Sequence, residues 1–397
     1  MQVGPPSPRP STVGLAPLVR IRDGRRFVPA RLFPEAKHLV SPDAGPLVGP
    51  AAFSHDDDDD DEIPPISASR DRRNPMLPAP RFYDRSKVSS VYVERASLVA
   101  EVADEYRRKH AVPPSSRDEV RVAAFGIDAQ IGFCTPGVSL FVPGAVEDAQ
   151  RTLDWLYRNL DQITQLHFSL DTHRIFQVSH PAWWVDDDGK HPPPFMPITK
   201  KDVECGRWRP VMQPAESLEY VEKLEATGKY VLTIWPYHTL LGGVSHALVP
   251  ALMEASMFHS LLRSSQAHFE TKGSHAVTEN YSVLSPEVRE LAGHSVGTFN
   301  AAFFEMLMAF DRVYVFGQAK SHCVLSTLRD LQEHIAQVDP KLMRKVYVLE
   351  DATSPVPAPA LDPLPPRLDF PRIAEQAFAE LRGAGMNLVK TSDPIAL

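Results

Sequence analysis

The feature that most constrains the fold is an alternation of short apolar segments with longer amphipathic segments, which begins near residue 95. The short segments are rich in β-branched residues, which is typical of strands that are covered on both faces. Strands that alternate with helices in this way predict a mostly parallel sheet with helices on each side. We therefore expect an α/β protein with a three-layer α-β-α fold and a sheet of roughly six strands.

The expected elements follow one another along the chain. Strands are expected at 121–128, 163–170, 230–235, 268–271, 312–317, 345–349 and 387–390. Helices are expected at 96–110, 146–160, 245–263, 300–310, 323–337 and 370–382. The strand at 230–235 is expected to be the third strand of the core sheet, after the strand at 163–170.

Two regions depart from the alternation. Residues 1–85 are rich in proline and contain an acidic run at 56–62, so they cannot bury enough apolar surface to offset the entropy of ordering. They predict a largely disordered N-terminal extension before one domain at 86–397. Residues 178–228 interrupt that domain with a long polar segment that contains three tryptophans, which favours an ordered, lid-like insertion.

Composition narrows the class of protein. A net charge of −8 argues against a general nucleic-acid binder, whose binding surface would be basic. Three cysteines cannot form a disulfide framework and suit a reducing compartment. The early residues show no apolar secretory signal, and the most apolar stretch is too short to span a bilayer. We expect a cytoplasmic protein with neither nucleic-acid nor membrane partners.

A thiol and a carboxylate stand at the ends of two expected strands. Cys323 follows the strand at 312–317 and opens a helix, whose positive end lowers the pKa of a thiol. Asp128 ends the strand at 121–128, at the edge where parallel sheets build their sites. Together they predict a nucleophile and its base. Taken singly, each residue is more often structural, because free cysteines are commonly buried and a strand-end aspartate can act as a cap.

Three further groups indicate a metal site at the same edge. Asp171 and His173 are two residues apart at the end of one strand, so their side chains point the same way. His238 follows the strand at 230–235, and His180 is a candidate fourth ligand. One carboxylate with imidazoles and open positions suits Zn, Fe or Mn. A single strand-end histidine is more often a hydrogen-bonded structural residue.

Two other residues allow opposed interpretations. Lys272 follows a short strand, where an ammonium would stabilise a thiolate, but these residues alone favour a surface lysine before a turn glycine. Ser295 lies in Gly-His-Ser-Val-Gly, which fits the nucleophile elbow of α/β-hydrolases. That elbow requires a preceding strand, and the residues before it are charged and helical in character. We therefore expect a polar turn at Ser295.

Five segments together resemble the motifs of one enzyme family, in the family's order, over roughly residues 120 to 355. These segments are 128–145, 170–173, 235–238, 272–273 and 317–324. They resemble the isochorismatase-like cysteine hydrolases, and within that family the nicotinamidase-like branch. Members that act on isochorismate usually lack the metal ligands, so their presence favours the amidase branch.

The resemblance implies a site and an activity. The implied triad is Asp128, Lys272 and Cys323, and the implied oxyanion hole is formed by the backbone N–H groups of Ala319 and Cys323. The implied metal ligands are Asp171, His173 and His238, and a non-proline cis peptide is implied at Gln318–Ala319. Phe133 and Trp235 would line an aromatic slot for the substrate. The implied reaction is nicotinamide plus water to nicotinate plus ammonia through a Cys thioester, with a divalent Zn, Mn or Fe ion.

Some features depart from the family. Lys320 and Ser321 stand where members commonly have Thr-Asp, the segment at 178–228 is longer than usual, and compact members have no counterpart of 1–85. Two alternatives therefore stay open: hydrolysis of another small amide, and a catalytically inactive binding or regulatory member. Members of the family commonly form homo-oligomers, so the resemblance also implies a homo-oligomer.

Overall fold

The computed structural model describes residues 77–273, 275–360 and 362–397. Most of the expected N-terminal extension, including its acidic run, lies outside the described residues. Of the described part, Leu77 and Phe82 are buried in the main hydrophobic core. Among the described residues, no helix combines the length and the apolar character that crossing a membrane requires.

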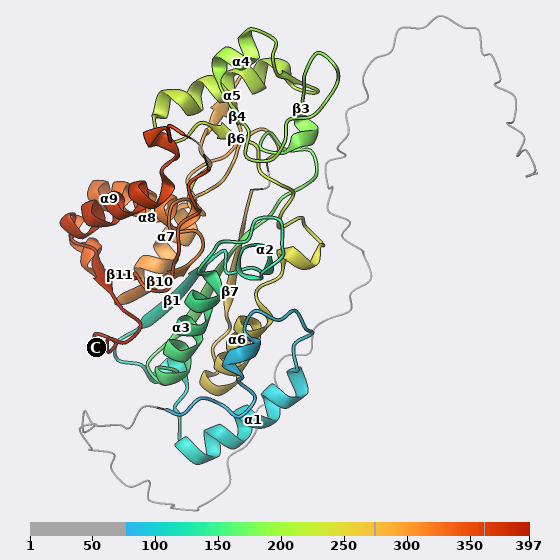
Figure 1. The fold of residues 1–397 in the computed structure, drawn as a ribbon. Helices are drawn as coiled ribbons and strands as arrows, with labels where there is room; N and C mark the ends of the chain where they lie inside the picture. Colours follow the sequence, from blue (N-terminus) through green and yellow to red (C-terminus); the bar gives the residue numbers. More distant parts are fainter. Residues whose placement is uncertain (1–76, 274, 361) are drawn as a thin grey trace, which may run out of the picture. The chain divides into compact units, whose positions relative to one another are not determined.

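A six-stranded sheet forms the centre of the domain, and all its neighbouring strands are parallel (Figure 1). The strand order is β12-β11-β10-β1-β2-β7. The strands are β1 (Val122–Ile127), β2 (Gln165–Asp171), β7 (His268–Lys272), β10 (Arg312–Gly317), β11 (Val346–Leu349) and β12 (Asn387–Val389). The fold class predicted from the sequence is confirmed.

Helices cover both faces of the sheet. Right-handed crossovers place α3 and α6 on one face, with α1 packed on α6, and α7, α8 and α9 on the other (Figure 1). These helices are α1 (Ala96–His110), α3 (Ala145–Arg158), α6 (Pro250–Arg263), α7 (Ala301–Met308), α8 (Cys323–Val338) and α9 (Phe370–Gly383). The short helix α2 (Ile131–Cys134) follows β1.

The strand order reverses between β1 and β10. From β1 the chain adds β2 and β7 on one side, and from β10 it adds β11 and β12 on the other. Ligands of open parallel sheets bind at such a switch point, outside the carboxyl ends of the strands. Asp128 follows β1 directly and Cys323 follows β10 after a short loop. The topology therefore brings the predicted nucleophile and base to one crevice.

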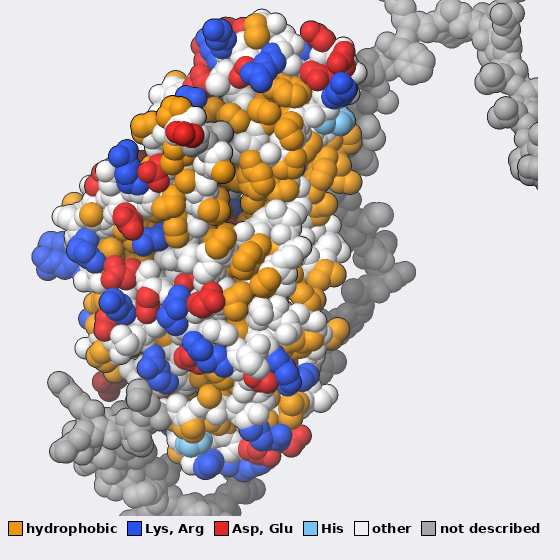
Figure 2. Space-filling view, viewed as in Figure 1, with side chains coloured by type: hydrophobic (Ala, Val, Ile, Leu, Met, Phe, Trp, Pro, Cys, Tyr) orange, Lys and Arg blue, Asp and Glu red, His pale blue; other side chains and the backbone are white. Residues whose placement is uncertain are grey.

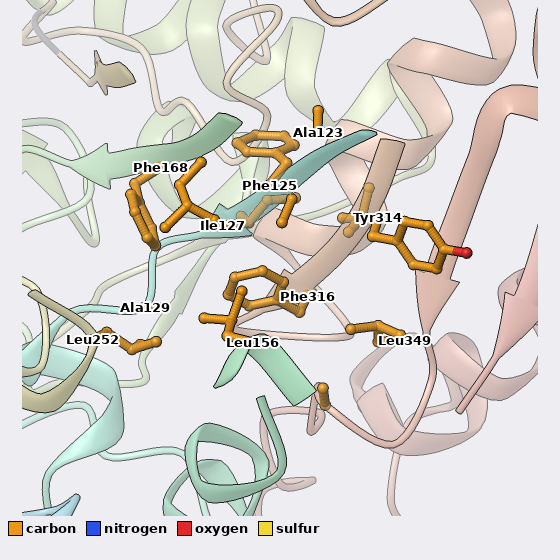
Figure 3. Packing of buried hydrophobic residues seen from close by; sticks show 14 of the residues in the cluster. Ala123, Phe125, Ile127, Ala129, Leu156, Phe168, Leu252, Tyr314, Phe316 and Leu349 are labelled. Carbon is orange, nitrogen blue, oxygen red and sulfur yellow. The ribbon is translucent and has the colours of Figure 1, made fainter. Parts of the chain in front are cut away.

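Two glycines allow the sheet to close at this point. Every residue of β1 is buried. A Cβ on Gly126 would lie 2.8 Å from the rings of both Phe168 and Phe316, which pack on either side of it (Figure 3). Gly317 has a φ of +116°, and a Cβ there would overlap the carbonyl oxygen of Ile127. Only glycine permits these approaches, so β10 can lie tightly against β1 at the edge of the site.

The prediction of a third core strand at 230–235 is wrong. Only β6 (Leu232–Thr233) forms there, and it pairs antiparallel with β4 (Pro197–Ile198), outside the central sheet. The strand beside β2 is β7 instead. The physical reason is burial: Leu232 and Ile234 pack into a separate hydrophobic cluster of the insertion. His238 therefore lies on a loop and not at a strand end.

The insertion at 178–228 is ordered around its own hydrophobic cluster, which includes Trp183, Trp184 and Tyr220. Residues from elsewhere in the chain, such as Val288, complete this cluster. The insertion contains two helices and three short strands that the sequence did not indicate. They are α4 (Lys200–Glu204), α5 (Pro214–Thr227), β3 (Trp184–Val185), β4 and β5 (Arg209–Pro210).

The elbow-like pentapeptide at 293–297 forms a surface hairpin. It includes β9 (His294–Ser295), which pairs antiparallel with β8 (Glu290–Leu291). Ser295 is exposed. A nucleophile elbow needs a buried core strand that leads into a helix, and this hairpin provides neither. The expected polar turn is confirmed, although the residues before it form a strand and not a helix.

Candidate active site

The carboxylate of Asp128 is fixed immediately after β1. Asp128 has a φ of +47°, a left-handed conformation that aspartate tolerates better than most residues. The Ser169 hydroxyl of β2 donates to Asp128 Oδ1 at 2.6 Å, and the Asp128 N–H donates to Ser169 Oγ at 3.1 Å. These two bonds across the sheet hold the carboxylate over the switch point.

Lys272 is the last residue of β7, in register with Asp171 of β2. Its Nζ lies 3.0 Å from Asp128 Oδ2 and 2.8 Å from Asp171 Oδ1. It also lies 3.6 Å from Cys323 Sγ and donates to the carbonyl oxygen of Asn280 at 2.7 Å. The lysine is buried, so the interpretation as a surface residue is wrong. The structure brings the three predicted triad residues into contact.

Cys323 is the first residue of α8 and is only 7% exposed. Burial raises the pKa of its thiol well above the ordinary value, although Lys272 opposes that shift. Burial therefore outweighs the lowering of this pKa that the helix N-terminus predicted. The Asp128 carboxylate also acts on the thiol and raises its pKa further. A thiol with a raised pKa needs a base to remove its proton before it can attack.

The two carboxylates around Lys272 differ in their proton affinity. Burial raises the pKa of Asp128, with Lys272 opposing the shift. Burial also acts against the charge of Asp171, but His173 and Lys272 hold the pKa of that carboxyl well below its usual range. Environments that separate the pKa values of neighbouring acids assign them different tasks. Asp128 is therefore the carboxyl suited to bind and release a proton, whereas the lowered pKa of Asp171 favours its ionised form.

The loop between β10 and α8 contains the cis peptide Gln318–Ala319 that the resemblance implied. The Gln318 N–H donates to the carbonyl oxygen of Ile127 at 2.8 Å, and the Gln318 amide donates to Asp148 Oδ2 at 2.9 Å. Ala319 and Cys323 both line the pocket. Gln318 thus ties the loop both to the end of β1 and to α3.

The expected metal ligands gather beside the triad. His173 Nε2 lies 2.9 Å and His238 Nε2 3.3 Å from Asp171 Oδ2. His180 joins them: one nitrogen each from His173, His180 and His238 lie within 4.8 Å of one another. Glu279 is close as well, with its Oε1 3.9 Å from His173 Nε2. All five side chains are buried.

The surrounding hydrogen bonds fit a divalent cation. Each of the three histidines places Nδ1 against a protein oxygen. His173 Nδ1 contacts Gln177 Oε1. His180 Nδ1 lies 2.9 Å from the carbonyl oxygen of Arg174, and His238 Nδ1 lies 2.7 Å from that of Pro236. Nε2 is then left for ligation, as in most protein metal sites. His180 Nε2 and Glu279 Oε2 are buried without a hydrogen-bond partner among the described residues.

The charge balance also favours a positive ion. Burial acts against a charge on His173, but the carboxylates of Asp171 and Glu279 raise its pKa to about 9. Imidazole and carboxylate ligands of this kind suit Zn, Mn or Fe. Sequence reasoning missed Glu279, because no strand end or paired ligand marks it in the chain. Its place beside His173 results from the loop that follows Lys272.

Aromatic side chains form the walls of the pocket. Phe133 and Trp235, the two residues expected in an aromatic slot, both line it. Phe133 meets His238 edge to face at 5.5 Å between ring centroids. Trp235 Nε1 donates to the Tyr281 hydroxyl at 3.0 Å, and Tyr281 lines the pocket as well. Aromatic side chains, the Cys323 thiol and candidate cation ligands therefore line one pocket.

The departure at Lys320–Ser321 does not place a charge at the thiol. Lys320 points away from the pocket, with Nζ 4.5 Å from the centroid of the Phe378 ring in α9. Ser321 Oγ accepts from the Val356 N–H at 3.0 Å and contacts His322 Nδ1 at 2.9 Å. Burial lowers the pKa of His322 to about 4. This serine thus orients a neutral imidazole next to Cys323.

The chain is similar to known proteins in structure and not to any protein-family model. No protein-family model matches the sequence, and no curated protein matches it. A nicotinamidase/pyrazinamidase of Acinetobacter baumanii is similar in structure, with 20% identity over 70% of this chain and 99% of its own, at a TM-score of 0.43. The yeast nicotinamidase has 19% identity over 68% of this chain and 99% of its own, at a TM-score of 0.43.

A pyrazinamidase of Pyrococcus horikoshii in complex with zinc has 16% identity over 68% of this chain and 98% of its own, at a TM-score of 0.38. Because the identities are 20% or less and the TM-scores are below 0.5, the interpretation of the site rests on its own geometry.

Proposed function

We propose that this protein is a metal-dependent cysteine amidohydrolase of the nicotinamidase type, which hydrolyses nicotinamide to nicotinate and ammonia. The observation that carries the proposal is the position of Lys272. Its Nζ contacts Asp128 and Cys323 on one side and Asp171 on the other. A nucleophile, its base and a cluster of cation ligands therefore share one buried lysine.

The first steps use the triad. Asp128, which contacts the same Lys272 ammonium as Cys323, accepts the proton of the Cys323 thiol. The sulfur then attacks the carboxamide carbon and forms a C–S bond. Lys272 remains protonated, because the carboxylates of Asp128 and Asp171 hold its pKa well above the usual value against the effect of burial. Its charge stabilises the thiolate as it forms.

The later steps release the products. The backbone N–H groups of Ala319 and Cys323 donate to the developing oxyanion. Asp128 returns the proton to the amide nitrogen, the C–N bond breaks and ammonia leaves. A water molecule that gives its proton to Asp128 then cleaves the thioester, which releases the carboxylic acid and restores the thiol.

The aromatic slot and the ligand cluster orient the substrate. Phe133 and Trp235 bind the faces and edge of a flat ring, and Asp171, His173 and His238, with His180 and Glu279, would hold the cation. When bound, a Zn, Mn or Fe ion supplies a Lewis acid for the pyridine nitrogen. Asp171 links the two parts of the site, because its Oδ1 contacts Lys272 and its Oδ2 faces the histidines.

The test is ammonia release from nicotinamide by the full chain, with zinc, manganese or iron added. We expect Cys323→Ala to lower the rate by about 10⁴-fold or more, because removal of a nucleophile disables the whole triad. Cys205→Ala is the matched control, since Cys205 is exposed and outside the site. A folded, metal-loaded wild-type protein without activity on nicotinamide, or Cys323→Ala at the wild-type rate, would contradict the proposal.

A further inference from the structure

A second cavity adjoins the catalytic pocket. It has a volume of about 540 Å³ and shares Leu140, Trp235 and Val356 with the pocket that contains Cys323. We call this second cavity the vestibule. Figure 2 shows hydrophobic side chains gathered on this face of the domain. The two spaces therefore lie side by side, with these three side chains between them.

The walls of the vestibule are almost entirely apolar. The loop after α2 contributes Phe141, the insertion contributes Phe195 and Met196, and the C-terminal part of the domain contributes Phe370. Among the described residues that line it, none carries a charged side chain, and Ser139 and Thr233 are its polar members. Such a surface gains stability by removing an apolar group from water and offers little to a charged one.

Phe195 shows that the vestibule is held open in advance. Its side chain is 52% exposed, although it packs edge to face on Trp235 with 6.0 Å between ring centroids. Its φ is +67°, which is unusual for an aromatic residue, and its N–H donates to the carbonyl oxygen of Ile234. A large exposed aromatic ring fixed in a strained conformation beside a reaction pocket is typical of a binding surface.

Proline stiffens the walls on both sides. Pro194 and Pro197 flank the Phe195 turn, and Pro357 and Pro359 lie in the facing segment. Proline fixes φ, so these segments lose little freedom when a ligand binds. The vestibule is therefore a preorganised apolar subsite that the insertion and the C-terminal segment form together.

We propose that the vestibule binds an apolar extension of the substrate, so that the preferred substrates are aromatic carboxamides larger than nicotinamide. This inference rests on the proposed function, because it places the carboxamide at Cys323. The chemistry is unchanged: the amide C–N bond breaks, ammonia leaves, and the acid is released with its apolar substituent still attached. The substituent on the ring passes Trp235 and packs against Phe195.

The binding test uses the zinc-loaded full chain with Cys323→Ala and measures the Kd of nicotinate and of each ring-phenyl isomer of nicotinate by calorimetry. We expect at least one phenyl isomer to bind about tenfold more tightly than nicotinate. Adding Phe195→Ala should reduce that preference to about twofold. Adding Met212→Ala, an exposed apolar side chain of the same insertion outside the vestibule, should leave it unchanged. Equal binding of all the acids, or a preference that survives Phe195→Ala, would overturn the inference.

Turnover by the protein with Cys323 intact separates this inference from the proposed function. Hydrolysis of nicotinamide and of its phenyl derivatives at equal kcat/KM would support the proposed amidase activity and contradict the proposal that the vestibule binds the substituent. Phe195-dependent binding of a phenyl acid, without hydrolysis of any amide, would support the vestibule as a binding subsite and contradict the proposed amidase activity. We expect the phenyl amide whose acid binds best to have the higher kcat/KM.

Discussion

The charged edge of the central sheet and the insertion at 178–228 are built on opposite principles. At the edge, Asp128, Asp171 and Lys272 are buried charges from three different strands or strand ends, held by ion pairs. The insertion is closed by aromatic packing around Trp183 and Trp184 in a hydrophobic cluster separate from the main core. The residues of the proposed chemistry thus come from the parallel sheet, whereas the insertion supplies part of the wall of the vestibule beside them.

The two regions should also respond differently to mutation. Buried charges depend on one another, because removal of one leaves its partners uncompensated in a medium of low dielectric. Aromatic residues in a small cluster lose packing and leave a cavity, but they leave no charge behind.

Lys272→Met should have the largest effect. It leaves Asp128 and Asp171 buried without their shared cation, so we expect the free energy of unfolding to fall by about 3–5 kcal/mol. Ammonia release should fall by about 10³-fold, since a charge that stabilises the thiolate is lost. Denaturant titration and the ammonia assay measure the two effects.

Lys223→Met is the matched control for that experiment. Lys223 is an exposed lysine paired with Glu219, and exposed pairs contribute about 0–1 kcal/mol. If Lys272→Met unfolded at the same denaturant concentration as Lys223→Met, the charged edge would not be the interdependent unit described above.

Trp183→Ala should destabilise the insertion by about 3–5 kcal/mol while the sheet persists. Trp183 is fully buried in the insertion's cluster and donates through Nε1 to Ser217 Oγ at 3.0 Å. Hydrogen exchange followed by mass spectrometry should show lost protection in 178–228 and unchanged protection in β1 and β10. Trp155→Ala, in the main core, should do the reverse. Equal loss in both regions from either variant would mean that they unfold as one unit.

Gln177→Ala should weaken cation binding by about 10–100-fold, because it removes the partner that orients His173. The Gln177 amide also donates to the carbonyl oxygen of Gly273 at 2.8 Å, so it ties the ligand loop to the end of β7. Zinc retention against a series of chelator concentrations measures the effect. Gln150→Ala, whose amide donates to the Arg85 carbonyl oxygen away from the site, should retain zinc as the wild type does. Equal retention by both variants would exclude an orienting role for Gln177.

The smallest predicted effect is on the pH dependence. Burial raises the pKa of Asp128 above its ordinary value of 3.8, and the base must be ionised, so kcat/KM should fall on the acid side at a pH above 3.8. The Ser169 hydroxyl lowers this pKa, so Ser169→Ala should raise it and move the acid limb of the profile to higher pH. A limb that stayed in place or moved to lower pH would assign the titration to another group.

Much of the fold could be predicted because local patterns and tertiary structure agree there. The expected helix at 96–110 forms at those residues, and strands form close to the expected bounds at β1, β2 and β10. The strand expected at 230–235 does not join the central sheet because of the tertiary contacts that its residues make. Its apolar residues could pack equally well into the core or into the insertion, and only the presence of Trp183, Trp184 and their neighbours decided in favour of the insertion.

By itself, the sequence determined the alternating α/β order and the residue types at the strand ends. These identified the candidates Asp128, Asp171, His173 and Cys323, because parallel strands direct their carboxyl ends to one edge, whereas Lys272 was implied only by the resemblance in the motifs. The tertiary structure alone decided how these residues meet: Lys272 lies between two carboxylates, Glu279 joins His173, and burial raises the pKa of Cys323. Proton affinity depends on burial and on neighbouring charges, which a chain acquires only when distant segments pack together.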